Sequence, residues 1–242
     1  MPLITPASIQ VKHGGYITAA FGEKGAGKSL FYVDTADVAE PLSVANFDRD
    51  VSHLLKKYKG KQVDLEVYQA TTDMTTAKAN CQRLVLQIQR AVKTGGIFAI
   101  DNGSAMWDNC KAAWLPSPEK GKIYPKEFGD ANSWMRGVHQ ILEDSNLWPI
   151  ITYPAVEIWQ SQSVGTGLYT YEGWKHTDLH LVNSVFLFAA GKPLGVAAVP
   201  TETSWPLKYR AQIVDSKLDP SVQGAILDNP RFADVLDATG LR

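Results

Sequence analysis

The stretch Gly22-Glu-Lys-Gly-Ala-Gly-Lys-Ser29 decides the fold, because it is a complete G-x-x-x-x-G-K-[ST] motif. In such a loop the glycines let backbone N–H groups turn toward phosphates, Lys28 reaches the β- and γ-phosphates, and the Ser29 hydroxyl binds Mg²⁺. The apolar residues 16–21 predict a strand directly before the loop, and a helix can start at Ser29. A glycine-rich surface turn is the alternative, which this strand–loop–helix setting disfavours. We therefore predict a site for a nucleoside triphosphate, formed by Gly22, Glu23, Lys24, Gly25, Ala26, Gly27, Lys28, Ser29 and Leu30.

Composition places the chain among ordinary soluble globular proteins. Of its 242 residues 45% are hydrophobic and 20% charged, enough for one large α/β domain. The net charge of −1 gives no overall basic field, so nucleic-acid binding would need a local patch. Cys81 and Cys110 form no C-x-x-C pair, which favours buried free thiols in a reducing compartment. With no signal-peptide pattern and no apolar run of membrane-spanning length, we expect a cytoplasmic protein without a membrane partner.

Strand-like and helix-like segments alternate along the chain. Helical spacing or composition predicts helices over 51–58, 75–92 and 131–146, and apolar stretches predict strands over 41–48, 63–69, 97–101, 148–153, 181–188 and 195–199. This alternation favours parallel βαβ units. We predict a three-layer α/β core of the P-loop nucleoside triphosphatase type with a mostly parallel sheet, in a single domain spanning 1–242. Long loops are expected near 111–128 and 159–176.

Acidic residues follow two of the expected strands. Asp101 ends the apolar strand 97–101, where a carboxylate can meet Mg²⁺ beside the phosphate loop; capping of a helix near Ser104 is the alternative. Asp48 and Asp50 follow the strand 41–48, and one of them could orient or deprotonate the attacking water. Turn and helix-cap chemistry is an equally good interpretation of Asp50. The predicted Mg²⁺ ligands are Ser29 and Asp101.

With these motifs the chain resembles the RecA-type P-loop ATPases that phages encode in their recombination modules, close to the single-strand-annealing group. The resemblance is carried by the phosphate loop, Asn46–Asp50, Phe98–Asp101, Gly173–His176, Val214–Lys217, Gly224 and Asn229–Pro230. It implies a RecA-like fold, ATP and Mg²⁺ as cofactors, a homo-oligomer, and phage or host recombination proteins as partners in the host cytoplasm.

The resemblance also implies roles for single residues. Asp50 stands where RecA-like proteins carry a water-activating glutamate, one methylene longer, and Thr152 stands where a polar residue senses the γ-phosphate. Lys217 corresponds to a basic finger that reaches into a neighbouring subunit's site. The expected catalytic residues are therefore Lys28, Asp50, Asp101 and Lys217.

RecA-like folds bind single-stranded DNA on loops after the later core strands, and the two expected loops suit that task. Sequence-independent binding of a strand needs cations for the phosphates and aromatic faces for the bases. Ordinary surface loops whose aromatic rings fold back onto the core are the alternative. The candidate nucleic-acid contacts are Lys111, Trp114, Lys120, Lys122, Tyr124, Lys126, Tyr169, Tyr171, Trp174 and Lys175.

The leading hypothesis is thus a Mg²⁺-dependent ATPase that binds single-stranded DNA and assists recombination or annealing. A motor or helicase-loader ATPase acting on protein or duplex DNA is a second hypothesis. The short Asp50 and the lysine at position 217 favour a third, a nucleotide-gated binding module with negligible turnover. A small-molecule kinase ranks last, because no arginine-rich lid segment is visible.

Overall fold

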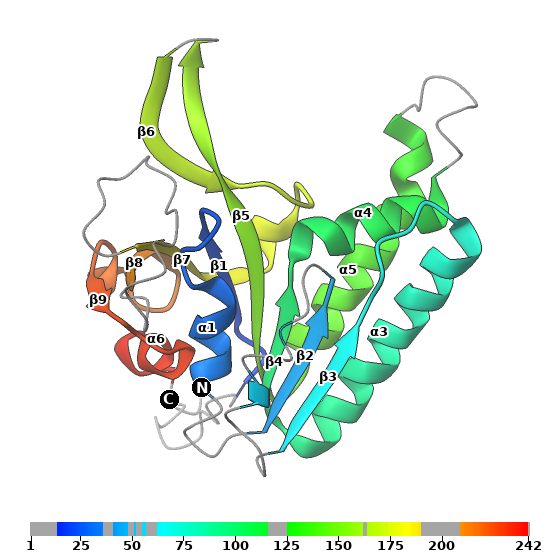
Figure 1. Cartoon of the computed structure of the whole chain (residues 1–242), viewed down its shortest axis with the longest axis horizontal. Helices are drawn as coiled ribbons and strands as arrows, with labels where there is room; N and C mark the ends of the chain where they lie inside the picture. The colour runs from blue at the N-terminus through cyan, green and yellow to red at the C-terminus, as the bar shows by residue number, and fades with distance from the viewer. Residues whose placement is uncertain are drawn as a thin grey trace, which may run out of the picture.

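The computed structural model describes residues 14–35, 41–47, 51, 55–56, 62–115, 125–161, 164–189 and 209–241. Its centre is a nine-stranded sheet in the order β3-β2-β4-β5-β1-β7-β8-β9, with β6 paired to β5 (Figure 1). The strands are β1 Ile17–Gly22, β2 Leu42–Asn46, β3 Val63–Val67, β4 Gly96–Asp101, β5 Leu147–Ser161, β6 Val164–Tyr171, β7 Leu181–Ala189, β8 Tyr209–Ser216 and β9 Ile226–Asp228. Every pairing from β3 to β7 along this order is parallel, and only β6, β8 and β9 join antiparallel. The predicted mostly parallel sheet is confirmed.

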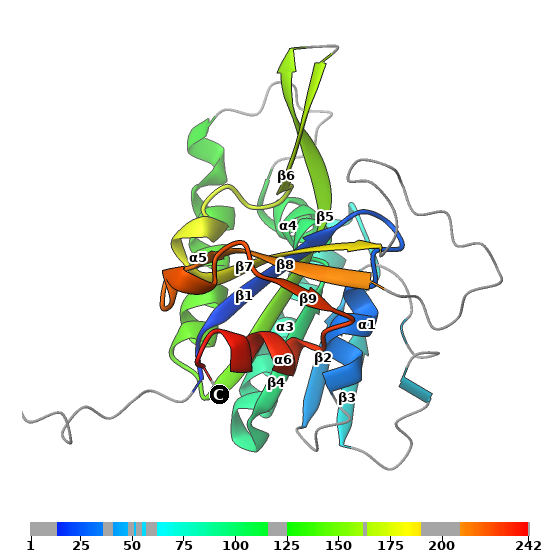
Figure 2. The same cartoon turned by 90° about the vertical axis from the view of Figure 1, so that its left-hand side faces the viewer.

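Helices cover both faces of this sheet (Figures 1 and 2). They are α1 Lys28–Val33, α3 Met74–Thr94, α4 Gly103–Trp114, α5 Gly129–Glu143 and α6 Phe232–Ala238, with short 3₁₀ turns η5 Pro125–Phe128, η6 Thr177–Leu179 and η7 Pro220–Val222. Successive strand residues point to opposite faces. In β4, Phe98 and Ile100 accordingly pack with α3, α4 and α5, while Ile97 and Ala99 pack with α1 and α6. The result is the predicted three-layer α/β arrangement.

Short polar side chains and glycines set the helix ends. The Asp73 carboxylate accepts the Thr76 N–H at 2.7 Å to begin α3, and Gly95, at φ +73°, ends it. Asn102 caps α4 by accepting the Ala105 N–H at 2.7 Å. Because Asn102 performs the capping, Asp101 beside it does not serve as the helix cap considered in the sequence analysis.

Most expected elements are confirmed, with one clear error. The stretch 160–176, predicted as a loop, contains the end of β5 and all of β6. Its glycines and serines are typical of a loop, but residues of high strand propensity such as Tyr169, Thr170 and Tyr171 pair with β5 in an extended conformation. The expected strand 195–199 and most of the helix 51–58 lie outside the described residues, whereas β8, β9 and α6 had not been anticipated.

Two further sequence-based expectations concern burial. Cys81 and Cys110 are buried free thiols, as predicted, and burial raises the pKa of Cys81 to about 12. Among the described helices, none has both the length and the apolar character needed to cross a bilayer.

The strands β5 and β6 extend beyond the sheet as a two-stranded arm (Figures 1 and 2). Near its base, Tyr171 stacks on Tyr153 at 4.7 Å and packs on Phe21 at 5.6 Å. Farther out, Val156 and Ile158 are 38% and 43% exposed. The arm is therefore anchored on the strand that leads into the phosphate loop.

Candidate nucleotide-binding site

The loop between β1 and α1 has the backbone shape that phosphate binding requires. Gly25 and Gly27 adopt φ values of +83° and +85°, in the left-handed region that favours glycine. A Cβ on Gly27 would also lie 3.1 Å from the ring of Tyr209, and one on Gly22 would lie 2.4 Å from the carbonyl oxygen of Leu187. These glycines are therefore required by backbone conformation and by close packing beneath the loop.

The two lysines of the loop differ in their surroundings. The Lys28 ammonium donates to the carbonyl oxygens of Gly22 at 2.7 Å and Glu23 at 3.0 Å, so it lies folded over the loop. Lys24 is exposed at the tip. The position of Lys28 fits its predicted role, because a phosphate held by the loop's N–H groups would lie within reach of its ammonium.

Asp101 is the centre of a buried cluster of hydroxyl groups. Its Oδ2 accepts hydrogen bonds from Ser29 Oγ and from the Tyr32 hydroxyl, both at 2.8 Å. Its Oδ1 accepts one from Thr152 Oγ1 at 2.6 Å. Asp101 is 5% exposed, so three donors stabilise a carboxylate that has little contact with solvent.

Strand order explains why these residues meet. The strands β4, β5 and β1 are adjacent and parallel, so Asp101, Thr152 and the phosphate loop lie at the same edge of the sheet. Ligands of open α/β sheets collect at this carboxyl edge. Oxygen ligands from carboxylate and hydroxyl groups are those that Mg²⁺ prefers, so Ser29 and Asp101 fit the predicted metal site.

Tyr32 is not among the predicted site residues, although the sequence carries a signal for it. Tyr32 follows Ser29 by three residues, and residues three apart share a face of a helix. A polar side chain at that position would therefore be expected to point toward the same partner as Ser29. The Tyr32 ring is fully buried, so its hydroxyl is one of the few polar groups on the inner side of α1.

The phosphate loop and the arm are electrostatically close. Burial, together with the negative charges of Glu23 and Glu157, raises the pKa of the Tyr169 hydroxyl of β6. The Tyr169 ring itself stacks on Phe186 of β7 at 5.2 Å. A movement of the Glu23 carboxylate would therefore change the electrostatic surroundings of β6.

The other expected catalytic residues are placed differently. Asp50 lies outside the described residues. Lys217 follows β8, whose Ser216 pairs with Asn183 beside the start of β1, and its ammonium donates to the Asp178 carbonyl at 2.8 Å. That is the opposite end of the sheet from the phosphate loop, about 17 Å away along β1. Lys217 therefore cannot act in the site of its own chain, and a role in a neighbouring subunit stays a prediction.

The expected nucleic-acid aromatics largely fold back onto the protein. Trp174 is 1% exposed and donates its indole N–H to Asn132 at 2.8 Å, so its ring is not available to a base. Tyr169 and Tyr171 stack in the core as described above. Trp114 packs against Trp134 in a tilted arrangement, with 5.5 Å between the ring centroids. For these rings the structure favours the alternative of ordinary packing.

The expected cationic contacts remain at the surface where they are described. Lys126 and Lys175 are exposed, and Lys111 forms an ion pair with Asp108 at 2.6 Å. Lys120, Lys122 and Tyr124 lie outside the described residues.

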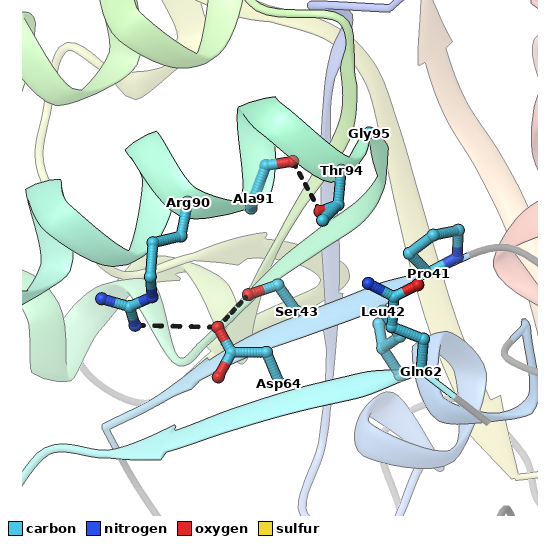
Figure 3. Close-up of a pocket in the computed structure, with 9 residues that line it drawn as sticks. All are labelled: Pro41, Leu42, Ser43, Gln62, Asp64, Arg90, Ala91, Thr94 and Gly95. Carbon is cyan, nitrogen blue, oxygen red and sulfur yellow. Dashed lines mark hydrogen bonds and ion pairs between the residues drawn. The ribbon is translucent and has the colours of Figure 1, made fainter. Parts of the chain in front are cut away.

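A separate hollow of about 240 Å³ lies at the opposite edge of the sheet (Figure 3). It is lined by Pro41, Leu42, Ser43, Gln62, Asp64, Arg90, Ala91, Thr94 and Gly95. Arg90 reaches Asp64 at 3.7 Å and also pairs with Glu66. Because β2 begins at Leu42, this hollow lies at the amino ends of the strands and does not belong to the phosphate site.

Comparison with known proteins supports the fold. A scan against protein-family models finds no match, and a search of curated proteins finds none either. Among solved structures, the crystal structure of the RadB recombinase matches with a TM-score of 0.56 at 10% sequence identity. The match covers 89% of this chain and 87% of that one. The chain therefore has the RecA-like α/β fold that the resemblance implied.

Proposed function

We propose that the chain is a Mg²⁺-dependent ATPase that binds single-stranded DNA and assists recombination or annealing. The observation that carries the proposal is the 2.8 Å contact between Ser29 of the phosphate loop and Asp101 at the end of β4. These two residues are the predicted Mg²⁺ ligands. They lie 72 residues apart in the sequence, and the strand order brings them together.

The site residues have separate proposed roles in ATP hydrolysis. The loop's backbone N–H groups and Lys28 hold the phosphates, and Mg²⁺, when bound by Ser29 and Asp101, neutralises charge on the transferred phosphoryl group. Thr152 and Tyr32 hold the Asp101 carboxylate in one orientation through hydrogen bonds of 2.6 and 2.8 Å. Asp50 is proposed to orient the attacking water.

Single-stranded DNA and a second copy of the chain are the proposed partners. The RecA-like fold and the exposed Lys126 and Lys175 near the carboxyl edge support DNA binding. Assembly of a homo-oligomer would be needed for Lys217 to reach a nucleotide, since it lies far from the loop of its own chain.

The test is ATP turnover by the purified chain, with and without Mg²⁺ and with and without a long single strand. Lys28→Ala should abolish turnover, because it removes the cation that reaches the transferred phosphate. Lys93→Ala is the matched control, because Lys93 is exposed in the last turn of α3 at the amino edge of the sheet. Unchanged turnover in Lys28→Ala would refute the proposal.

The effect of the strand separates the three hypotheses. Stimulation of turnover by single-stranded DNA supports the recombination function. ATP turnover that is the same with and without DNA supports a protein-coupled motor instead. Tight ATP binding with negligible turnover under every condition supports the nucleotide-gated binding module.

A further inference from the structure

A pocket of about 330 Å³ opens beside α4 and is distinct from the phosphate site. It is lined by Trp107, Phe128, Asn132, Gly173 and Lys175, which come from α4, η5, α5 and the turn after β6. We propose that this pocket binds an unpaired base of a single-stranded nucleic acid, with Lys175 contacting the adjacent phosphate. The inference deepens the proposed function and rests on its single-stranded partner.

The walls of the pocket suit a flat ring. The rings of Trp107 and Phe128 are only partly buried, and their centroids lie 6.3 Å apart at an angle of 32°. They therefore form two adjoining aromatic walls, on one of which a base can stack while its edge contacts the other. Trp107 and Phe128 line this pocket, whereas Trp174 is buried and donates its indole N–H to Asn132.

Asn132 supplies a fixed polar group. The Trp174 indole N–H can only donate, and it donates to Asn132 Oδ1 at 2.8 Å. The amide oxygen of Asn132 is thereby directed at Trp174, and its Nδ2 group is directed away from it. Two N–H donors on a pocket wall match the acceptors of a nucleobase, which are ring nitrogens in adenine, carbonyl oxygens in thymine, and both kinds in guanine and cytosine.

Charge favours an anionic ligand. Among the lining residues that the structure describes, Lys175 is the charged one, and it is exposed. The Lys111 ammonium lies 5.8 Å from the centroid of the Trp107 ring, although it also pairs with Asp108. One phosphate on Lys175 and one stacked base on Trp107 would together account for the lining.

Short backbone segments and a hydrogen bond also connect the pocket to the predicted Mg²⁺ site. α4 begins two residues after Asp101, and Trp107 lies just over one turn into this helix. Ser104 donates to the carbonyl oxygen of Glu172, which ties the start of α4 to the turn that carries Gly173 and Lys175. A base bound in the pocket would therefore contact α4 and the turn after β6, both of which lie at the end of the sheet that carries Asp101.

Binding of a labelled oligo(dT) to the full chain, measured by fluorescence anisotropy, tests the assignment. Loss of one stacking contact of about 1–3 kcal/mol predicts that Trp107→Leu raises Kd roughly 5- to 140-fold, and Phe128→Leu should act in the same direction. Trp107→Phe should retain most of the affinity, because it keeps an aromatic face. A plot of log affinity against log salt has a negative slope, and Lys175→Gln should reduce the magnitude of that slope by about 0.7.

Trp148→Leu is the matched control, since Trp148 is partly buried against Tyr16 at the amino end of β5. Thermal unfolding of each variant shows whether it is folded. If Trp107→Leu does not fold, ultraviolet crosslinking of wild type to an iodouracil-containing strand replaces it, and adducts on Trp107 or Phe128 are expected. Adducts confined to other residues overturn the assignment.

The two proposals fail in different ways. If wild type hydrolyses ATP and binds the strand, but Trp107→Leu binds equally well, the pocket assignment is wrong and the proposed function stands. If wild type binds no strand while hydrolysing ATP, both the pocket assignment and the DNA partner are wrong. Binding of free thymidine monophosphate by a chain that binds no strand also overturns the assignment.

Discussion

Replacing Tyr32 by phenylalanine should destabilise the protein through Asp101. The variant keeps the buried ring and removes only the hydroxyl that donates to Asp101 Oδ2 at 2.8 Å. A hydrogen bond to a charged group contributes about 1.5–3 kcal/mol. Because Ser29 donates to the same oxygen at 2.8 Å, we expect the lower half of this range, about 1.5–2 kcal/mol. For a chain of this size, a decrease of that amount in the free energy of unfolding lowers the Tm by about 3–8 °C.

Thermal and urea unfolding of Tyr32→Phe, Thr152→Val and Tyr169→Phe would measure the effect. Thr152→Val should cost at least as much, since Thr152 donates to the other carboxylate oxygen at 2.6 Å. Tyr169→Phe removes a hydroxyl from a more exposed setting, away from Asp101, and should cost less. If Tyr32→Phe unfolds at the wild-type temperature, the hydroxyl does not stabilise the carboxylate and our account of the cluster is wrong.

Two further predictions concern pH and packing. Burial lowers the pKa of His139 to about 4, below its unfolded value, so the stability gained from the neutral ring is present above about pH 6.5 and is lost as pH falls toward 4. The loss of unfolding free energy, measured by urea unfolding, should reach about 3 kcal/mol. In His139→Phe the free energy of unfolding should decrease less as pH falls. Parallel pH profiles for the two proteins would contradict this prediction. Gly22→Ala places a Cβ 2.4 Å from the backbone oxygen of Leu187 and should cost about 1–3 kcal/mol, whereas Gly129→Ala, with open space around it, should be nearly neutral. Equal stabilities of the two alanine variants would show that the strand beneath the loop can move.

Local sequence signals identified the nucleotide site, and pairing between distant segments determined the rest. The glycine pattern from Gly22 to Ser29 and the acid at the end of 97–101 are contiguous, so their roles could be predicted. That Thr152 and Tyr32 would converge on Asp101 depends on strand order, which the sequence does not state directly. The position of β5 between β4 and β1 brings Thr152 to Asp101, and Tyr32 follows from the helix after β1.

The arm and the aromatic residues show the same limit. Residues 164–171 are rich in glycine and threonine, and they become a strand because β5 continues past the sheet and offers a pairing edge. Trp174 and Trp107 are equally hydrophobic in the sequence. Only the tertiary contacts bury the first and leave the second to line a pocket. Composition could therefore suggest a nucleic-acid surface but could not select its aromatic residues.

The position of the phosphate loop has a consequence for the newly made chain. Gly22 is synthesised early, yet β1 is flanked by β5 and β7, and the ring that packs against Gly27 belongs to Tyr209. At about 5–20 residues per second, Tyr209 leaves the ribosome's active centre roughly 10–40 s after Gly22. The tyrosine beneath the loop is missing throughout that interval, and the neighbouring strands β5 and β7 are completed only late in it. ATP in the cell therefore cannot guide the early stages of folding, and any ribosome-bound fragment that ends before β8 should not be retained on immobilised nucleotide.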